Sequence, residues 1–185
     1  WGSTKADTID AGAGADTIYA GAGGDTIDGG AGTDTIVTTA ADTAADIDGT
    51  GTGTSTGIVI NLGATELTDS AVNTAMGSDF LAGNQSGVAS GTATYLFNSE
   101  SNTNAAIVDT LTTIENVTGT NGDDYLVGSA TANTIDAGAG TDYITTGAGA
   151  DVVVYDAATE GGSATTVTSL TATTDDYTVT LAGTT

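Results

Sequence analysis

The sequence predicts an all-β protein: a parallel β-roll, or β-solenoid, of stacked nine-residue repeats with additional β-strands. Two observations carry this prediction. A nine-residue unit with glycine in its first half, aspartate or asparagine at position six and an aliphatic residue at position eight occurs four times near the start of the 185-residue chain and four times later. No stretch shows a convincing amphipathic helical pattern. Fixed periods of this kind are typical of solenoids, in which each repeat packs only against its neighbours.

The repeats divide the chain into four segments. Residues 1–37 form a first β-roll block, and residues 119–154 form a second. Residues 38–118 are a degenerate, β-rich middle segment with strand-like runs at 57–62, 94–97 and 106–111. Residues 155–185 form a C-terminal β-strand segment, because polar and apolar residues alternate between Thr165 and Leu181. The blocks are in phase modulo nine, which favours a middle segment that continues the solenoid with inward residues at Val72, Leu81, Val108 and Val117. The alternative is that residues 38–118 form a separate β layer.

Each position of the unit has its own structural role. The glycine-rich first half forms a turn, because glycine tolerates positive φ and leaves backbone carbonyls exposed. Positions seven to nine are short and β-prone. Strands this short are stable only when they stack in parallel and share a column of inward aliphatic residues, which in the first block are Ile9, Ile18, Ile27 and Ile36.

The charge of the chain indicates that its acidic residues need a bound cation, because the sequence supplies almost no positive charge of its own. Lys5 is the single basic residue against 24 acidic ones, which gives a formal net charge of −23. This balance excludes nucleic acid as a partner, and an anionic membrane surface would repel the chain. Crowded carboxylates also oppose compaction. Divalent metal is the simplest source of compensating charge.

Missing residue types exclude other functions and sites. The chain has no cysteine and no histidine, so it has no disulfides, thiolate sites, histidine metal sites or catalytic triads. We therefore expect no enzymatic activity. No run is apolar enough to span a bilayer, so we expect no membrane insertion. Because the chain opens almost directly on a repeat, we expect a mature fragment or part of a longer polypeptide.

The nine-residue unit suits calcium in particular. Ca²⁺ takes six to eight oxygen ligands from carboxylates, backbone carbonyls and water. Neighbouring strands in a parallel stack lie about 4.8 Å apart, so two successive turns can hold one ion between them. The candidate ligands are the glycines at positions two and four and the acidic or amide residue at position six, together with one isolated aspartate between the blocks: Asp7, Gly12, Gly14, Asp16, Gly21, Gly23, Asp25, Gly30, Gly32, Asp34, Asp79, Asp124, Asn133, Gly138, Gly140, Asp142, Gly147, Gly149 and Asp151.

These units resemble the hemolysin-type, or RTX, calcium-binding nonapeptide repeat family. The resemblance covers residues 2–37 and 119–154 and extends to the run that leads into the second block from Ile114. It implies a parallel β-roll in which two units make one turn, so that position-six residues pair two units apart. The implied pairs are Asp7 with Asp25, Asp16 with Asp34, Asp124 with Asp142 and Asn133 with Asp151. Several Ca²⁺ ions are the implied cofactors.

Some units depart from the repeat pattern. The first unit has lost two glycines and carries Lys5, and Asn133 offers a neutral oxygen, so we expect weaker ion sites at both places. Asp79 stands in an isolated unit. Asp10, Asp28 and Asp136 follow the inward aliphatic residue and are expected to face solvent, where they aid solubility.

The sequence leaves three functions open. The first is an extracellular structural protein that assembles copies of itself with Ca²⁺ into a surface layer, sheath or filament, as in bacterial surface-layer proteins of RTX type. The second is the RTX region of a larger enzyme or toxin exported by a type I secretion system. The third is a segment of an adhesin that binds cell-surface glycan. All three place the chain outside the cell. Without calcium we expect a coil, because the chain has little core and much charge.

Overall fold

The computed structural model describes residues 1–3, 5–21, 23–38, 55–76, 88–97, 108–156, 166–169 and 178–182. The predictions for Asp79 and Leu81 fall outside these ranges. No helix in the described part is long and apolar enough to cross a membrane.

Every nine-residue unit forms one short strand, over the β-prone residues at its end. These strands are β1 (Thr8–Asp10), β3 (Thr17–Tyr19), β4 (Thr26–Asp28), β6 (Thr35–Val37), β11 (Tyr125–Val127), β12 (Thr134–Asp136), β13 (Tyr143–Thr145) and β14 (Val152–Asp156). The turns contain the two-residue strands β2 (Ala13–Gly14) and β5 (Ala31–Gly32). Strands outside the units are β7 (Ser55–Asn61), β8 (Thr92–Phe97), β9 (Val108–Thr112), β10 (Asn116–Thr118), β15 (Thr166–Ser169) and β16 (Thr178–Ala182).

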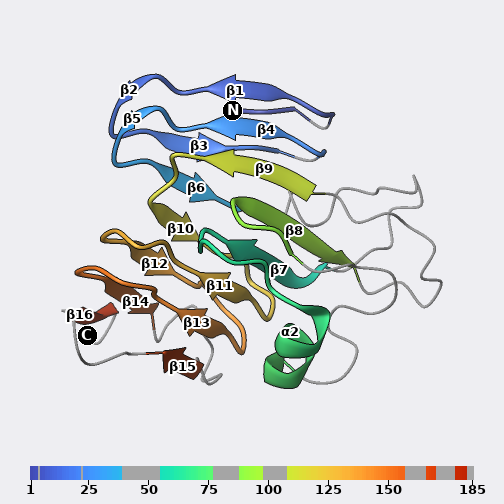
Figure 1. Ribbon diagram of the computed structural model, residues 1–185, viewed down its shortest axis with the longest axis vertical. Helices are drawn as coiled ribbons and strands as arrows, with labels where there is room; N and C mark the ends of the chain where they lie inside the picture. Colours follow the sequence, from blue (N-terminus) through green and yellow to red (C-terminus); the bar gives the residue numbers. More distant parts are fainter. Residues whose placement is uncertain are drawn as a thin grey trace.

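Successive units alternate between two facing sheets, which is the predicted β-roll (Figure 1). One sheet has the order β1-β4-β9-β8-β7-β11-β13-β15, and the other has the order β16-β14-β12-β10-β6-β3. Strands two units apart pair in parallel and in register, so Ile9 lies beside Ile27 and Ile18 beside Ile36. The period of eighteen residues therefore places identical positions directly above one another.

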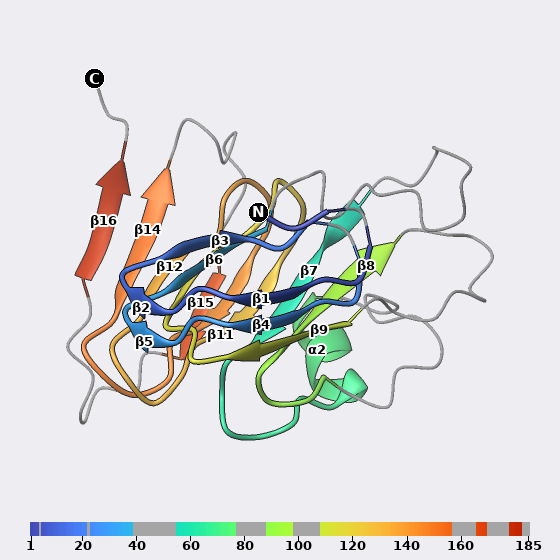
Figure 2. The same ribbon diagram turned by 90° about the horizontal axis from the view of Figure 1, so that it is seen from above.

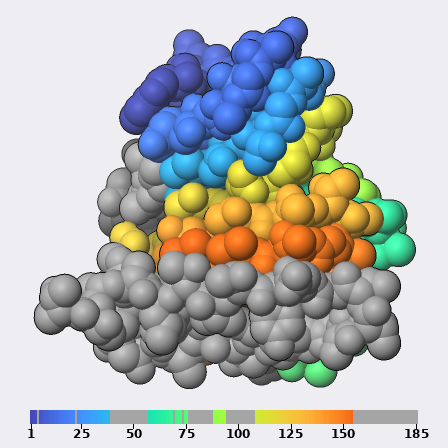
Figure 3. Space-filling view, turned by 90° about the vertical axis from the view of Figure 1, so that its left-hand side faces the viewer, coloured from blue at the N-terminus to red at the C-terminus, as the bar shows by residue number. Residues whose placement is uncertain are grey.

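The two blocks join into one stack although the sequence separates them. Strand β6 of the first block pairs in parallel with β10, which pairs with β12 of the second block. In the other sheet β4 pairs with β9, so that Ile27 lies beside Leu111. Seen from the turns, the first block lies above the residues around β10, which lie above the second block (Figure 3).

The eight-stranded sheet contains an interruption that the repeat pattern does not predict. Strand β8 is antiparallel to both of its neighbours, β7 and β9. Strand β7 then pairs in parallel with β11, and the regular stack resumes. Because the six-stranded sheet has no equivalent insertion, the two sheets differ by two strands at this level.

The main core lies between the sheets and is built chiefly from inward aliphatic side chains of the strands, with Ile58 and Ile60 both coming from β7. Ile27, Ile36, Leu126, Ile135 and Ile144 are fully buried there. Two aromatic pairs continue the stacking outside the core, with ring centroids 4.0 Å apart for Trp1 and Tyr19 and 4.6 Å apart for Tyr125 and Tyr143.

Two expectations for the middle segment were wrong. The chain contains a helix, α2 (Asp69–Met76), whose Val72 packs with Val59 and Tyr125 in a second buried cluster. This helix lies beside the eight-stranded sheet and away from the six-stranded one (Figure 2). Val72 is therefore not an inward residue of the roll. Val108 is 40% exposed, because Leu111 takes the inward place on β9.

Candidate metal sites

The turns between strands form two rows along opposite edges of the roll. The first row contains residues 2–7, 20–25, 119–124 and 137–142, which lead into the eight-stranded sheet. The second row contains residues 11–16, 29–34, 113–115, 128–133 and 146–151, which lead into the six-stranded sheet. Turns two units apart lie directly above one another because their flanking strands pair in register.

The glycines predicted as carbonyl-presenting residues all adopt a conformation that other residues avoid. Their φ angles lie between +86° and +152° at Gly12, Gly14, Gly21, Gly23, Gly30, Gly32, Gly138, Gly140, Gly147 and Gly149. Stacking adds a second constraint in the lower turn of each pair. A Cβ atom on Gly30 would lie 1.9 Å from the carbonyl oxygen of Gly12, whereas one on Gly12 would meet no atom within 4 Å.

The position-six residues form ladders in both rows, with the pairs that the resemblance to the RTX repeat implies. In the first row the Asp7 backbone N–H donates to Asp25 Oδ1 at 2.8 Å, and the Asp124 N–H donates to Asp142 Oδ1 at 2.9 Å. The second row has equivalent bonds, from Asp16 to Asp34 at 2.9 Å and from Asn133 to Asp151 at 2.8 Å. Each bond uses one carboxylate oxygen of the lower aspartate, and at Asp34 and Asp151 the other oxygen accepts no hydrogen bond.

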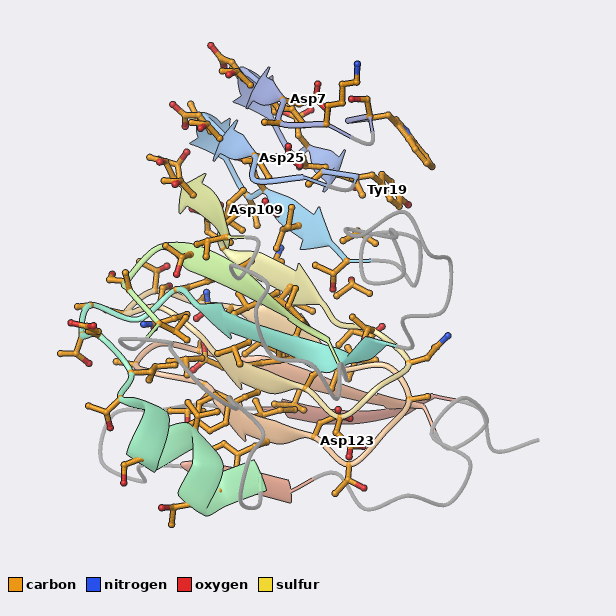
Figure 4. All side chains as sticks on the ribbon, turned by 90° about the vertical axis from the view of Figure 1, so that its right-hand side faces the viewer. Asp7, Tyr19, Asp25, Asp109 and Asp123 are labelled. Atoms are coloured by element: carbon orange, nitrogen blue, oxygen red, sulfur yellow. The ribbon has the colours of Figure 1, made fainter. Side chains whose placement is uncertain are left out.

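Sequence reasoning missed two acidic residues that continue these ladders between the blocks. Asp109 is fully buried and accepts the N–H of Asp25 at 2.7 Å. Asp7, Asp25 and Asp109 follow one another down one side of the roll (Figure 4). Glu115 accepts the N–H of Asp34 at 2.8 Å through Oε2. Both had a signal in the sequence, because each precedes an inward residue, Leu111 or Val117, by two positions, as the repeat aspartates do.

Several repeat aspartates are placed as a bound cation would require. The Oδ2 atoms of Asp16, Asp34 and Asp151 are buried and accept no hydrogen bond. Asp34 is fully buried and Asp151 is 1% exposed. An ionised carboxylate buried without a partner costs on the order of several kcal/mol. Hard oxygen donors beside exposed glycine carbonyls are the ligands that calcium prefers.

Backbone carbonyls must supply part of any ion's ligand set. Within the described ranges, no three acidic side chains gather where one metal ion could be held. Each pair of turns offers two position-six side chains, so backbone carbonyls, which glycine leaves exposed, would have to supply further oxygen ligands. When calcium is bound, it supplies the positive charge that these carboxylates lack.

Burial changes the acidity of Asp124. The desolvation of its fully buried side chain raises the pKa to about 8, and hydrogen bonds from Thr120 oppose this rise only in part. The nearby carboxylate of Asp142 raises the pKa further. At Asp7 the effect is opposite, because hydrogen bonds from the Ser3 backbone and side chain lower the pKa.

The remaining predicted residues lie as follows. Asn133 is buried and Lys5 is exposed. Asp10 and Asp28 are exposed, as expected, whereas Asp136 is half-buried. Asp28 also accepts hydrogen bonds from the Gly30 N–H and the Thr113 hydroxyl, so it helps to hold the turn as well as to face solvent.

Comparison with known proteins agrees with this geometry. Residues 1–36 and 118–153 match the model of the RTX calcium-binding nonapeptide repeat, with four copies. A search of curated proteins found no match. The matched segments are the two blocks whose turns carry the glycines and buried aspartates described above. The chain thus carries RTX calcium-binding nonapeptide repeats in two blocks, and Ca²⁺ is the ion that such repeats bind.

Proposed function

We propose that this chain is an extracellular structural protein that folds and assembles copies of itself with Ca²⁺ into a surface layer, sheath or filament. The observation that carries the proposal is the open construction of the roll at its ends. Strands β1 and β3 are the outermost described strands at one end, and β15 and β16 are outermost at the other. All four pair in parallel with their inner neighbours, so another copy added end to end would continue the same parallel pattern.

The uppermost turn of the second row supports this end as a surface for stacking. Gly12 and Gly30 both have positive φ. A Cβ atom on Gly30 would meet the Gly12 carbonyl of the turn above it, whereas the space around a Cβ atom on Gly12 is open. The 11–16 turn is therefore built like a turn that receives another above it. A turn from a second copy would find the same surface that the 29–34 turn presents to 11–16.

The charge of the chain explains why assembly would require calcium. Copies with a formal net charge of −23 repel one another in the absence of a divalent cation. Calcium outside cells is abundant enough for modules with dissociation constants of about 10⁻⁴–10⁻³ M. The proposal therefore places the chain outside the cell, after export by a type I system, and assigns it no catalytic step.

Light scattering during a calcium titration tests the proposal, with circular dichroism recorded in parallel. The wild-type chain should gain β structure and then grow into large particles, and magnesium at equal ionic strength should not replace calcium. Gly12→Ala should fold but grow poorly, because its methyl group would occupy the space of an incoming turn. Thr33→Ser, an exposed change in the turn below, serves as the control and should grow like wild type. Folding without any growth of the wild type would refute assembly and favour a carrier or glycan-binding role.

A further inference from the structure

The position-six residues fall into two groups that the repeat pattern does not separate. In three turns, a serine or threonine at position two bonds to the position-six side chain. Ser3 donates to Asp7 Oδ2 from its N–H at 2.6 Å and from its hydroxyl at 2.8 Å. Thr120 donates to Asp124 from its N–H at 2.7 Å and from its hydroxyl at 2.8 Å.

The third turn of this kind ends in the amide of Asn133. Ser129 donates to Asn133 Oδ1 from its N–H at 2.8 Å and from its hydroxyl at 3.3 Å. Asn133 Nδ2 in turn donates to the Glu115 carbonyl oxygen and to the Ser129 hydroxyl. Both ends of this side chain are therefore satisfied within the protein. We call the 2–7, 119–124 and 128–133 turns the self-closed turns.

We call the turns with glycine at position two, 11–16, 20–25, 29–34, 137–142 and 146–151, the glycine turns. In two of them the position-two N–H is seen to donate to groups other than the position-six side chain. The N–H of Gly30 donates to Asp28 Oδ1 at 3.1 Å and to the Thr113 hydroxyl at 2.7 Å rather than to Asp34. The N–H of Gly138 donates to Asp136 Oδ1 at 3.3 Å. At Gly30 and Gly138, which both have positive φ, the amide thus donates away from the position-six side chain. The Oδ2 atoms of Asp16, Asp34 and Asp151, all in glycine turns, accept no hydrogen bond.

Position in the stack explains why the two kinds of turn occur where they do. The self-closed turns are the upper members of three pairs of stacked turns. The lower members need glycine, because a Cβ atom on Gly21, Gly138 or Gly147 would lie within 2.1 Å of the carbonyl oxygen of Ser3, Thr120 or Ser129 above it. Among the described residues, no other nine-residue unit is stacked directly above these three upper turns, and each carries a side chain at position two. The segment above 128–133 is the shorter 113–115 turn, whose Glu115 carbonyl accepts from Asn133. The fourth pair differs, since both of its turns, 11–16 and 29–34, have glycine there.

We infer that the self-closed turns replace calcium with their own Ser or Thr donors, and that the glycine turns of Asp16, Asp34 and Asp151 hold the ions. Each self-closed turn then closes without metal as the upper member of its pair of stacked turns. The 11–16 and 29–34 pair is the part of the roll most dependent on calcium. The inference rests on the calcium binding of the repeats and does not require assembly.

Matched Asp→Asn substitutions test this division. Asp34→Asn and Asp124→Asn each remove one carboxylate that is fully buried, the first from a glycine turn and the second from a self-closed turn. Bound calcium per chain is measured by equilibrium dialysis and elemental analysis. Asp34→Asn should bind one ion fewer than wild type, because ligand charge sets affinity in such sites, and Asp124→Asn should bind as many as wild type. Asp16→Asn and Asp7→Asn repeat the comparison at the outer turns, where misfolding is less of a concern.

The reverse change gives an independent readout. Asn133→Asp should add no bound ion, because Ser129 already supplies the donors that close this turn. An added ion in Asn133→Asp, a lost ion in Asp7→Asn or Asp124→Asn, or an unchanged count in both Asp16→Asn and Asp34→Asn would overturn the inference. A wild-type chain that binds no calcium would overturn the calcium assignment itself, which is a distinguishable result.

Discussion

Two glycines with the same backbone conformation separate the effect of stacking from the effect of strain. Gly12 has φ +95° and Gly30 has φ +90°, and the two occupy the same position in turns that lie directly above one another. Alanine at either site carries the strain of an unfavourable φ, roughly 1–3 kcal/mol. At Gly30 the new methyl group would also lie 1.9 Å from the Gly12 carbonyl oxygen, and overpacking of this kind adds about 1–3 kcal/mol.

Urea denaturation in saturating calcium measures the difference. Gly30→Ala should be less stable than Gly12→Ala by about 1–3 kcal/mol, which for a slope of about 2 kcal/mol per molar urea is a midpoint lower by roughly 1 M. Gly30→Ala should also weaken calcium binding, because the 11–16 and 29–34 turns must separate to admit the methyl group. Equal losses in the two variants would refute the close stacking of these turns.

Three further predictions concern the core, the junction between the blocks and pH. Ile135→Ala should cost about 2–5 kcal/mol of unfolding free energy because the Ile135 side chain is fully buried. Val108→Ala, on the surface, should change the unfolding free energy by less than about 0.5 kcal/mol. The midpoints of urea denaturation in calcium measure both effects. Asp109→Ala should cost about 1–3 kcal/mol of unfolding free energy, because it removes the acceptor of the Asp25 N–H. Asp109→Asn keeps an acceptor oxygen and should cost less. Equal losses in the two variants would exclude this hydrogen bond as the cause. In calcium-free buffer, burial raises the pKa of Asp124 from an ordinary 3.8 to about 8, which favours the protonated folded form. The resulting contribution to stability is therefore full below about pH 4 and is lost as the pH rises towards 8. Circular dichroism should show more β structure at pH 5 than at pH 8, and the reverse order would contradict this pKa assignment.

The repeat spacing predicted the β-roll, and the resemblance to RTX repeats implied its pairs of turns. Position eight predicted the buried column, and the two-unit turn implied by the resemblance predicted that Asp16 would meet Asp34 and that Asn133 would meet Asp151. Such predictions succeed because each is a local rule repeated at a fixed period, so register follows from the period alone.

The middle segment was harder to predict because its pairing is not periodic. The phase of the two blocks suggested Val108 as an inward residue, but the Asp109-Thr-Leu111 triplet resets the register by matching the Asp-Thr-Ile of the repeats. The strand-like run at 94–97 predicted a strand at β8, but its antiparallel pairing and the packing of helix α2 depend on contacts across long sequence separations, which no local pattern encodes. Glu115 was overlooked because the repeat pattern favours aspartate, although its place before Val117 is the position-six place.

Hydrogen exchange of the backbone amides, followed by mass spectrometry with and without calcium, tests the central claim most directly. The claim is that calcium neutralises the buried aspartates in the turns and so allows both repeat blocks to form the roll. Peptides from residues 8–37 and 119–154 should be protected in millimolar calcium and should exchange rapidly in chelator. Equal protection of both blocks in chelator and in calcium would show that the roll forms without the ion and would contradict the account.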